Sequence, residues 1–174
     1  MRGEIRAQRA CRRRSTPTFV FADLVGYTAH TSERGDAAAA DLARQFRRMM
    51  CALSRDHGAR QVKSMGDGVM IWSADAATAV SLAADALRRV GASPDLLPVR
   101  IGVHTGPAVR RGSDFYGTAV NTAARLADAA QPNEALVSEA TWAMARCEFT
   151  KPVDRPRELL LRGLQRPVAA WRLA

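Results

Sequence analysis

Residues 19–28, FVFADLVGYT, place an aspartate and a glycine at the end of an apolar run. The run is short and rich in aromatic and β-branched side chains, a pattern typical of a buried strand that carries a polar side chain at its end. Residues 62–70, VKSMGDGVM, have the same form. The two stretches therefore predict two strands that deliver two carboxylates, Asp23 and Asp67.

Two such carboxylates could share a divalent cation. Mg²⁺ fits this arrangement because it takes one or two protein carboxylates and completes its coordination with water and substrate phosphate oxygens. Each aspartate also has an ordinary interpretation. Gly66-Asp67-Gly68 is typical of a tight hairpin turn, and Asp23 at a strand end could serve as a cap. These two stretches leave the alternatives open.

Two further blocks follow, VRIGVHTG at residues 99–106 and SDFYGTAVNTAARL at residues 113–126. With all four in view, the chain resembles the catalytic domain of the class III nucleotidyl cyclases, the adenylyl and guanylyl cyclases. The resemblance runs from about Thr18 to Leu173, and the blocks occur in the family's order. It is strongest for the bacterial stand-alone adenylyl cyclases that act as homodimers.

The composition suits one domain. The chain has 174 residues, of which 47% are apolar, enough for a normal core. Residues 1–17 hold six arginines and one glutamate, so +5 of the net +9 lies there and 9 − 5 = +4 remains. We expect residues 1–17 to be a basic tail without fixed structure and residues 18–174 to form one catalytic domain, with no regulatory domain ahead of it. A nucleic-acid or membrane binder acting through the tail is the alternative.

The location is predicted from cysteines and hydropathy. Three cysteines, Cys11, Cys51 and Cys147, form no C-x-x-C, so neither a disulfide framework nor a zinc site is expected. No apolar run approaches the ~18 residues of a membrane span. The basic N-terminus lacks the apolar segment of a signal peptide. These features predict a cytoplasmic protein.

Periodicity predicts strands alternating with helices around one antiparallel hairpin. This order favours an α+β fold, a ferredoxin-like antiparallel sheet with helices on one face and a C-terminal extension, as in the class III cyclases. The run from Arg110 to Asp114 is too short for a long projecting arm. The predicted strands are 18–25, the hairpin 59–73, 99–105, 134–138, 157–162 and 167–173, and the predicted helices are 36–56, 75–90, 117–130 and 139–146.

The helix at 117–130 carries two polar residues one turn apart. Asn121 and Arg125 stand at i and i+4, so both point to the same side. Such a pair is commonly just a solvated helix face. The resemblance implies more: it matches the family's N-x-x-x-R, in which the asparagine positions the ribose and the arginine stabilises charge on the α-phosphate. A guanidinium suits this role because its planar fork stays ionised.

The resemblance also implies the metal and phosphate contacts. It predicts two divalent cations per site, Mg²⁺ or Mn²⁺. Arg162 stands where many relatives have a lysine, so its charge is kept and its shape is not. The matching metal positions are Asp23, Leu24 and Asp67, and the matching phosphate positions are Val25, Gly26, Tyr27, Thr28, Arg100 and Arg162.

Base choice is implied by Lys63 and Asp114, which match the pair that reads the purine. Adenylyl cyclases carry Lys and Asp there, whereas guanylyl cyclases typically carry Glu and Cys. Adenine offers an amino donor to Asp114 and a ring acceptor to Lys63, and guanine presents the reverse pattern. We therefore expect ATP as the substrate.

The resemblance implies a homodimer whose two equivalent sites are shared. Asp23, Asp67 and Arg100 would come from one subunit, and Lys63, Asp114, Asn121, Arg125 and Arg162 from the other. The implied reaction converts ATP into 3′,5′-cyclic AMP and pyrophosphate. A guanylyl cyclase, or a catalytically silent domain that only binds nucleotide, is the alternative. His104 lies within an apolar strand, so we expect a core or hydrogen-bonded histidine rather than a general base.

Overall fold

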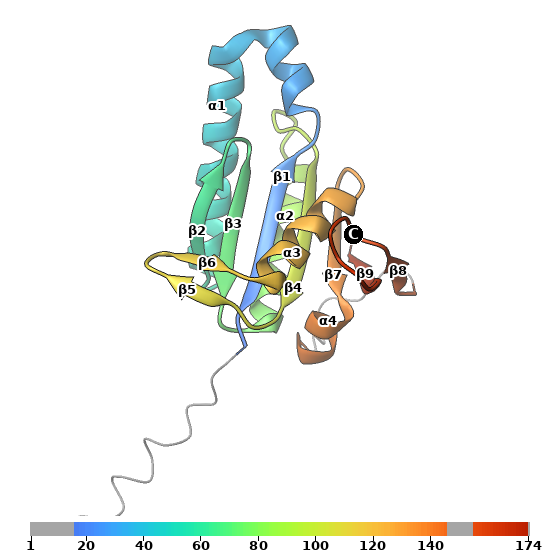
Figure 1. The fold of residues 1–174 in the computed structure, drawn as a ribbon. Helices are drawn as coiled ribbons and strands as arrows, with labels where there is room; N and C mark the ends of the chain where they lie inside the picture. The colour runs from blue at the N-terminus through green and yellow to red at the C-terminus, as the bar shows by residue number, and fades with distance from the viewer. Residues whose placement is uncertain (1–15, 146–154, 174) are drawn as a thin grey trace, which may run out of the picture.

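The computed structural model describes residues 16–145 and 155–173, and Figure 1 shows a twisted sheet with helices on both sides. Within these ranges the sheet has seven strands in the order β2-β3-β1-β4-β7-β9-β8, with β4 and β7 parallel and the other neighbours antiparallel. The strands are β1 (Thr18–Leu24), β2 (Arg60–Met65), β3 (Gly68–Ser73), β4 (Val99–Thr105), β7 (Glu134–Ser138), β8 (Arg157–Leu159) and β9 (Val168–Leu173).

The helices are α1 (Tyr27–Asp56), α2 (Ala76–Gly91), α3 (Thr118–Ala129) and α4 (Glu139–Ala145). The prediction for the first helix was too short. Its helical backbone begins at Tyr27 and is interrupted by Gly35, whose φ of 83° lies in the left-handed region. The prediction followed the apolar stripe, which begins only after Gly35, because the first two turns are largely exposed. None of the described helices combines the length and the apolar character needed to span a membrane.

The mixed α+β fold with a mostly antiparallel sheet is confirmed, but the helices do not all lie on one face. Val20 and Ala22 of β1 pack in the core with α1 and α2, whereas Phe19 and Phe21 pack with α3 on the other side. Gly102 in β4 allows α3 to pack closely on that second face. A Cβ at that position would lie 2.2 Å from the Ala123 carbonyl oxygen, so only glycine lets the α3 backbone rest on the strand. A single apolar face in the sequence pattern of α3 does not say which side of the sheet it covers.

A second, two-stranded sheet was not predicted. It pairs β5 (Val109–Arg111) with β6 (Asp114–Tyr116) in a hairpin that projects beside β2 in Figure 1. Strands of three residues are too short to give a period-two signal. The predicted strand 157–162 ends at Leu159, so Arg162 lies in the connection before β9. The basic tail, apart from its last two residues, and Cys11 and Cys147 lie outside the described residues.

Candidate active site

A row of three paired strands gathers the first set of candidate residues. Asp23, the penultimate residue of β1, is opposite Gly68 in β3 and Arg100 in β4. Asp67 directly precedes Gly68, in the two-residue turn between β2 and β3. Strand register therefore brings both carboxylates and one guanidinium to the same end of the sheet. Arg100 Nη2 donates to Asp23 Oδ2 at 2.9 Å.

Glycine at position 68 makes this approach possible. An ideal Cβ there would lie 3.0 Å from Asp23 Oδ1 and 3.2 Å from the Ala22 carbonyl oxygen. Gly66 has φ of 62°, as the first central residue of a type II′ hairpin turn requires. The turn interpretation of Asp67 and its place beside Asp23 are thus both correct. The GDG motif was visible in the sequence, but the sequence did not show that Gly66 is needed for its positive φ and Gly68 for the space beside Asp23.

Electrostatics at this end of the sheet favour a cation. Burial raises the pKa of the Asp67 carboxyl, and the negative charge of Asp23 raises it further, against smaller opposing effects of a backbone hydrogen bond and Arg100. Arg100 is the cation placed against Asp23 by an ion pair. A divalent ion would relieve the repulsion between the two carboxylates.

The donor set fits Mg²⁺ or Mn²⁺. Carboxylate oxygens are hard ligands, and a site with two of them leaves the remaining positions to water and phosphate oxygens. Among the residues that the structure describes, no group of three or more His, Cys, Asp or Glu side chains could form a closed metal cage. Leu24 has a buried side chain, so it could reach a cation only through its backbone.

The segment after Asp23 joins β1 to α1. Val25 N donates to the Pro98 carbonyl oxygen at 2.7 Å, and Gly26 adopts φ of 80° before the helix begins. Tyr27 and Thr28, which were matched to phosphate contacts, are the first residues of α1. The first amide groups of any α-helix have no acceptor within the helix, and at this end no side chain caps them. Such an end is suited to phosphate oxygens beside the carboxylate cluster.

The second set includes a direct ion pair between two hairpins. Lys63 Nζ in β2 donates to Asp114 Oδ2 in β6 at 2.7 Å, and Phe115 N donates to Asp114 Oδ1 at 2.8 Å. The hydrogen bond from Lys63 is the main reason that the pKa of Asp114 is lowered. Both side chains are partly exposed. Two residues that are 51 positions apart in sequence thus present a donor and an acceptor side by side.

The polar side of α3 is exposed, as the i, i+4 spacing predicted. Arg125 Nη1 donates to Asp128 Oδ2 at 2.8 Å. Arg125, Asp128 and Arg162 line the same shallow hollow of about 340 Å³, so the loop before β9 lies beside α3. Asp128 was overlooked in the sequence, although its i, i+3 spacing from Arg125 was a usable signal.

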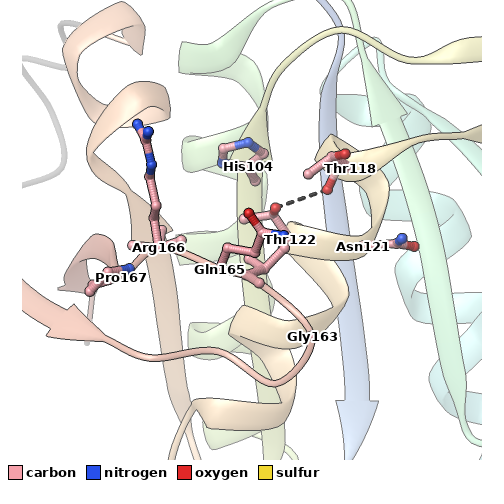
Figure 2. Close-up of a pocket in the computed structure, with 10 residues that line it drawn as sticks. His104, Thr118, Asn121, Thr122, Gly163, Gln165, Arg166 and Pro167 are labelled. Atoms are coloured by element: carbon pink, nitrogen blue, oxygen red, sulfur yellow. Dashed lines mark hydrogen bonds between the residues drawn. The ribbon is translucent and has the colours of Figure 1, made fainter.

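Asn121 stands at the edge of a larger hollow of about 550 Å³ between α3 and residues 163–168 (Figure 2). His104 in β4 also lines it, and the His104 Nδ1 lies 2.8 Å from Ser138 Oγ. Burial lowers the pKa of His104 to about 4. The expectation of a core or hydrogen-bonded histidine is confirmed, and no hydrogen bond of the described residues links His104 to either aspartate.

No hydrogen bond or ion pair links the two sets within the described part of one chain. Across the described ranges, 16–145 and 155–173, no hydrogen bond or ion pair joins Asn121 or Arg125 to Asp23, Asp67 or Arg100. One chain therefore presents a carboxylate cluster at a strand end and, elsewhere, a Lys–Asp pair with a polar helix face.

Comparison with known proteins assigns the family. The sequence model described as the adenylate and guanylate cyclase catalytic domain matches residues 11–173. An adenylate cyclase of Streptomyces coelicolor is 32% identical over 120 residues, which cover 69% of this chain and 32% of the relative. The chain belongs to the class III adenylyl and guanylyl cyclase catalytic domain family. The alignments with curated relatives span 28–40% of those relatives' own length.

Solved structures agree with the fold. The adenylyl cyclase CyaB from P. aeruginosa has a TM-score of 0.77 at 23% identity, with 91% of this chain and 93% of that chain covered. The guanylate cyclase domain of RhGC from Catenaria anguillulae, in complex with GTP, has a TM-score of 0.80 at 19% identity, with 92% and 97% covered. Because adenylyl and guanylyl cyclases share the fold, the base cannot be chosen from the fold alone.

Proposed function

We propose that the protein is an adenylyl cyclase that converts ATP into 3′,5′-cyclic AMP and pyrophosphate. The observation that carries this proposal is the carboxylate cluster, in which strand register and the turn between β2 and β3 set Asp23 beside Asp67 and Arg100. Membership of the cyclase family gives the cluster its chemistry. The reaction is an attack of the ribose 3′-hydroxyl on the α-phosphorus, with pyrophosphate as the leaving group.

Asp23 and Asp67, with the backbone of Leu24, would hold two divalent cations. Bound there, the cations would supply Lewis-acid activation of the 3′-hydroxyl and charge neutralisation of the triphosphate. Arg100 keeps Asp23 in place and adds positive charge close to the phosphates. The backbone N–H groups of residues 27–28 at the start of α1, after the Val25-Gly26 turn, would donate hydrogen bonds to the phosphate oxygens.

Arg125 and Asn121 would act on the reacting end of the nucleotide. The Arg125 guanidinium would meet the charge that develops on the α-phosphoryl oxygens, where a preformed donor stabilises the transition state. Asn121 would orient the ribose by hydrogen bonds, which places the 3′-hydroxyl for attack. Arg162, in the hollow next to Arg125, would contact the terminal phosphates.

The Lys63–Asp114 pair supports ATP over GTP. In the structure the two side chains satisfy one another at 2.7 Å, and both are accessible enough to exchange this partner for a base. Asp114 would accept from the adenine amino group, and Lys63 would donate to the adenine ring nitrogen. Guanine would place a carbonyl acceptor against the carboxylate and leave buried polar groups mismatched.

The separation of the two residue sets within one chain supports a homodimer. A chain that carries both sets can close a two-fold symmetric pair in which each site takes one set from each subunit. The carboxylate cluster of one subunit would then meet Asn121 and Arg125 of the other. A monomer would be inactive in this arrangement.

Product analysis tests the proposal. Purified protein is incubated with ATP or with GTP, each with Mg²⁺, with Mn²⁺ or with a chelator, and the products are separated by liquid chromatography and mass spectrometry. We expect cyclic AMP and pyrophosphate from ATP, no product with chelator, and a much smaller yield of cyclic GMP. Equal turnover of GTP would assign a guanylyl or mixed cyclase instead. Nucleotide binding without any product would assign a silent domain.

A further inference from the structure

Four side chains form a layered stack between the two hairpins that carry Lys63 and Asp114. The rings of Trp72 in β3 and Phe115 in β6 are stacked, with centroids 5.8 Å apart and planes inclined by 13°. The Arg60 guanidinium lies 5.7 Å from the Trp72 ring centre, and the Arg110 guanidinium lies 5.9 Å from the Phe115 ring centre. The stack thus runs from β2 through β3 and β6 to β5, with a cation at each end.

Phe115 is the residue through which the stack acts. It follows Asp114 directly, and its amide donates to Asp114 Oδ1 at 2.8 Å. The Phe115 ring also contacts the Phe19 ring of β1 edge to face, with the ring centroids 5.3 Å apart. Two aromatic rings from the main sheet therefore hold the Phe115 ring. Because the Asp114 carboxylate is bonded to the Phe115 backbone, fixing this ring also fixes the carboxylate.

The register of β2 aims Lys63 at the same place. Gln61 is opposite Ile71, but Lys63 is opposite Met70, so Val62 is the extra residue of a β-bulge. Regular pairing would put Lys63 opposite Val69, which packs in the α1 and α2 core. The bulge instead turns Lys63 to the α3 face, where Met70 lies. Trp72 is two residues beyond Met70 in β3 and shares that face.

Trp72 is less favourable in this packed position than an apolar side chain without an N–H group would be. Its Nε1 is buried and makes no hydrogen bond in the described part of the chain, and an unpaired buried N–H is unfavourable. An aliphatic or phenyl side chain would fill the place without that cost. The broad indole face, which covers Phe115 and also receives Arg60, is what the tryptophan adds.

We propose that Trp72 is a positioning residue for base selection, which holds Phe115 so that Asp114 stands opposite Lys63 when the purine enters. The inference rests on the proposed function, because it assigns the Lys63–Asp114 pair to the base. The ion pair cannot hold the two hairpins by itself, since both partners are partly exposed and such pairs contribute little. The stack supplies the rigidity that discrimination between two purines requires.

Steady-state kinetics on the full chain test this role with Trp72→Leu and Trp72→Phe. Loss of the indole should let Asp114 move, so Trp72→Leu should raise KM for ATP about tenfold and lower the ATP-to-GTP ratio of kcat/KM to a similar extent, with kcat changed by less than about threefold. Trp72→Phe keeps a stacking ring and should recover most of the ratio. Trp142→Leu is the matched control, because Trp142 in α4 packs against Trp171 in β9 and not against the hairpins that carry Lys63 and Asp114, so it should leave the ratio unchanged.

Arg110→Ala provides a second variant with little effect on folding, because Arg110 is exposed at the end of the stack. It should shift the ratio in the same direction by about twofold, as a partly exposed cation–π contact would. Thermal unfolding checks that each variant is folded. If Trp72→Leu lowers kcat while the ATP-to-GTP ratio stays at the wild-type value, or if all parameters stay unchanged, Trp72 has no positioning role.

A binding experiment separates this inference from the proposed function. The affinities of wild type and Trp72→Leu for ATP and for GTP are measured by competition against a fluorescent ATP analogue. Calcium is the divalent cation in this experiment, so that binding is followed in place of turnover. If wild type makes no cyclic nucleotide, the proposed activity fails, yet a preference for ATP that weakens in Trp72→Leu still supports the positioning role. If wild type makes cyclic AMP and the binding preference is equal in the two proteins, only the positioning role fails.

Discussion

The carboxylate cluster and the second set of candidate residues, Lys63, Asp114 and Arg125, are built in opposite ways. Asp23 and Asp67 are set by strand register and a two-residue turn, and they lie against one another with Arg100 as their cationic neighbour. In the other set, Lys63 is satisfied by Asp114 and Arg125 by Asp128, within the same chain. The first region places two carboxylates beside one guanidinium, and the second contains one Lys–Asp and one Arg–Asp ion pair.

The difference indicates which kind of ligand each region is suited to bind. The carboxylate cluster gains most from a cation, since burial and repulsion by Asp23 already disfavour the ionised form of Asp67. In the proposed function, the Lys–Asp and Arg–Asp pairs would exchange a partner when a nucleotide binds, and this exchange would cost little because the pairs are partly exposed. The carboxylate cluster would therefore hold the metal, and the set with Lys63, Asp114 and Arg125 would bind the nucleotide.

The largest effect on activity should come from a substitution in the carboxylate cluster. Asp23→Asn keeps the size of the side chain and removes its charge, so cyclic AMP formation should fall at least about a thousandfold, or ~4 kcal/mol in the barrier. Asp41→Asn is the control, because Asp41 is an exposed partner of Arg44 on α1. Turnover within about tenfold of wild type, with the thermal midpoint unchanged, would show that the cluster is not the metal site.

Mixing two inactive variants should sharpen the comparison, since the regions would act from different subunits. Asp23→Ala and Arg125→Ala should each be inactive, and co-refolding them should restore roughly a quarter of wild-type activity, because half of the dimers are heterodimers with one intact site. The recovered activity should fall on dilution. If mass spectrometry finds heterodimers but the mixture stays inactive, each site is contained within one chain.

The smallest effect is in the titration of the two regions. The pKa of Asp67 should lie above that of an ordinary aspartate because of burial and Asp23, whereas the pKa of Asp114 should lie below it because of the Lys63 hydrogen bond. The Asp114 contribution to stability is present above the pKa of the unfolded carboxyl and is lost as the pH falls through the folded pKa. The Asp67 contribution has the opposite sign and is lost as the pH rises through its folded pKa.

Carboxyl carbon NMR shifts across the acidic range measure both titrations in metal-free protein. Asp23→Asn should lower the pKa of Asp67 and leave the pKa of Asp114 unchanged. Lys63→Met should raise the pKa of Asp114 and leave the pKa of Asp67 unchanged. A pKa of Asp67 below that of Asp114 would contradict the contrast between the two regions.

Much of the architecture followed from local pattern. The strand at 99–105 and the strand at 134–138 have the predicted bounds, and the apolar stripe of α3 is buried with Asn121 and Arg125 left exposed. These features depend on near neighbours in sequence, which periodicity reports. The first turns of α1 were missed because their residues are largely exposed, and the β5–β6 hairpin was missed because it is short.

The sequence by itself determined the elements, the cyclase family and the residue types that can bind metal, phosphate and purine, because each of these is written in short blocks. Only the tertiary structure decided that α3 covers the opposite face of the sheet, that Gly68 admits Asp23 beside the Asp67 turn, and that a bulge at Val62 turns Lys63 toward Asp114. Strand register and helix packing join residues that are distant in sequence, and no local pattern records which of the possible pairings has the lowest free energy.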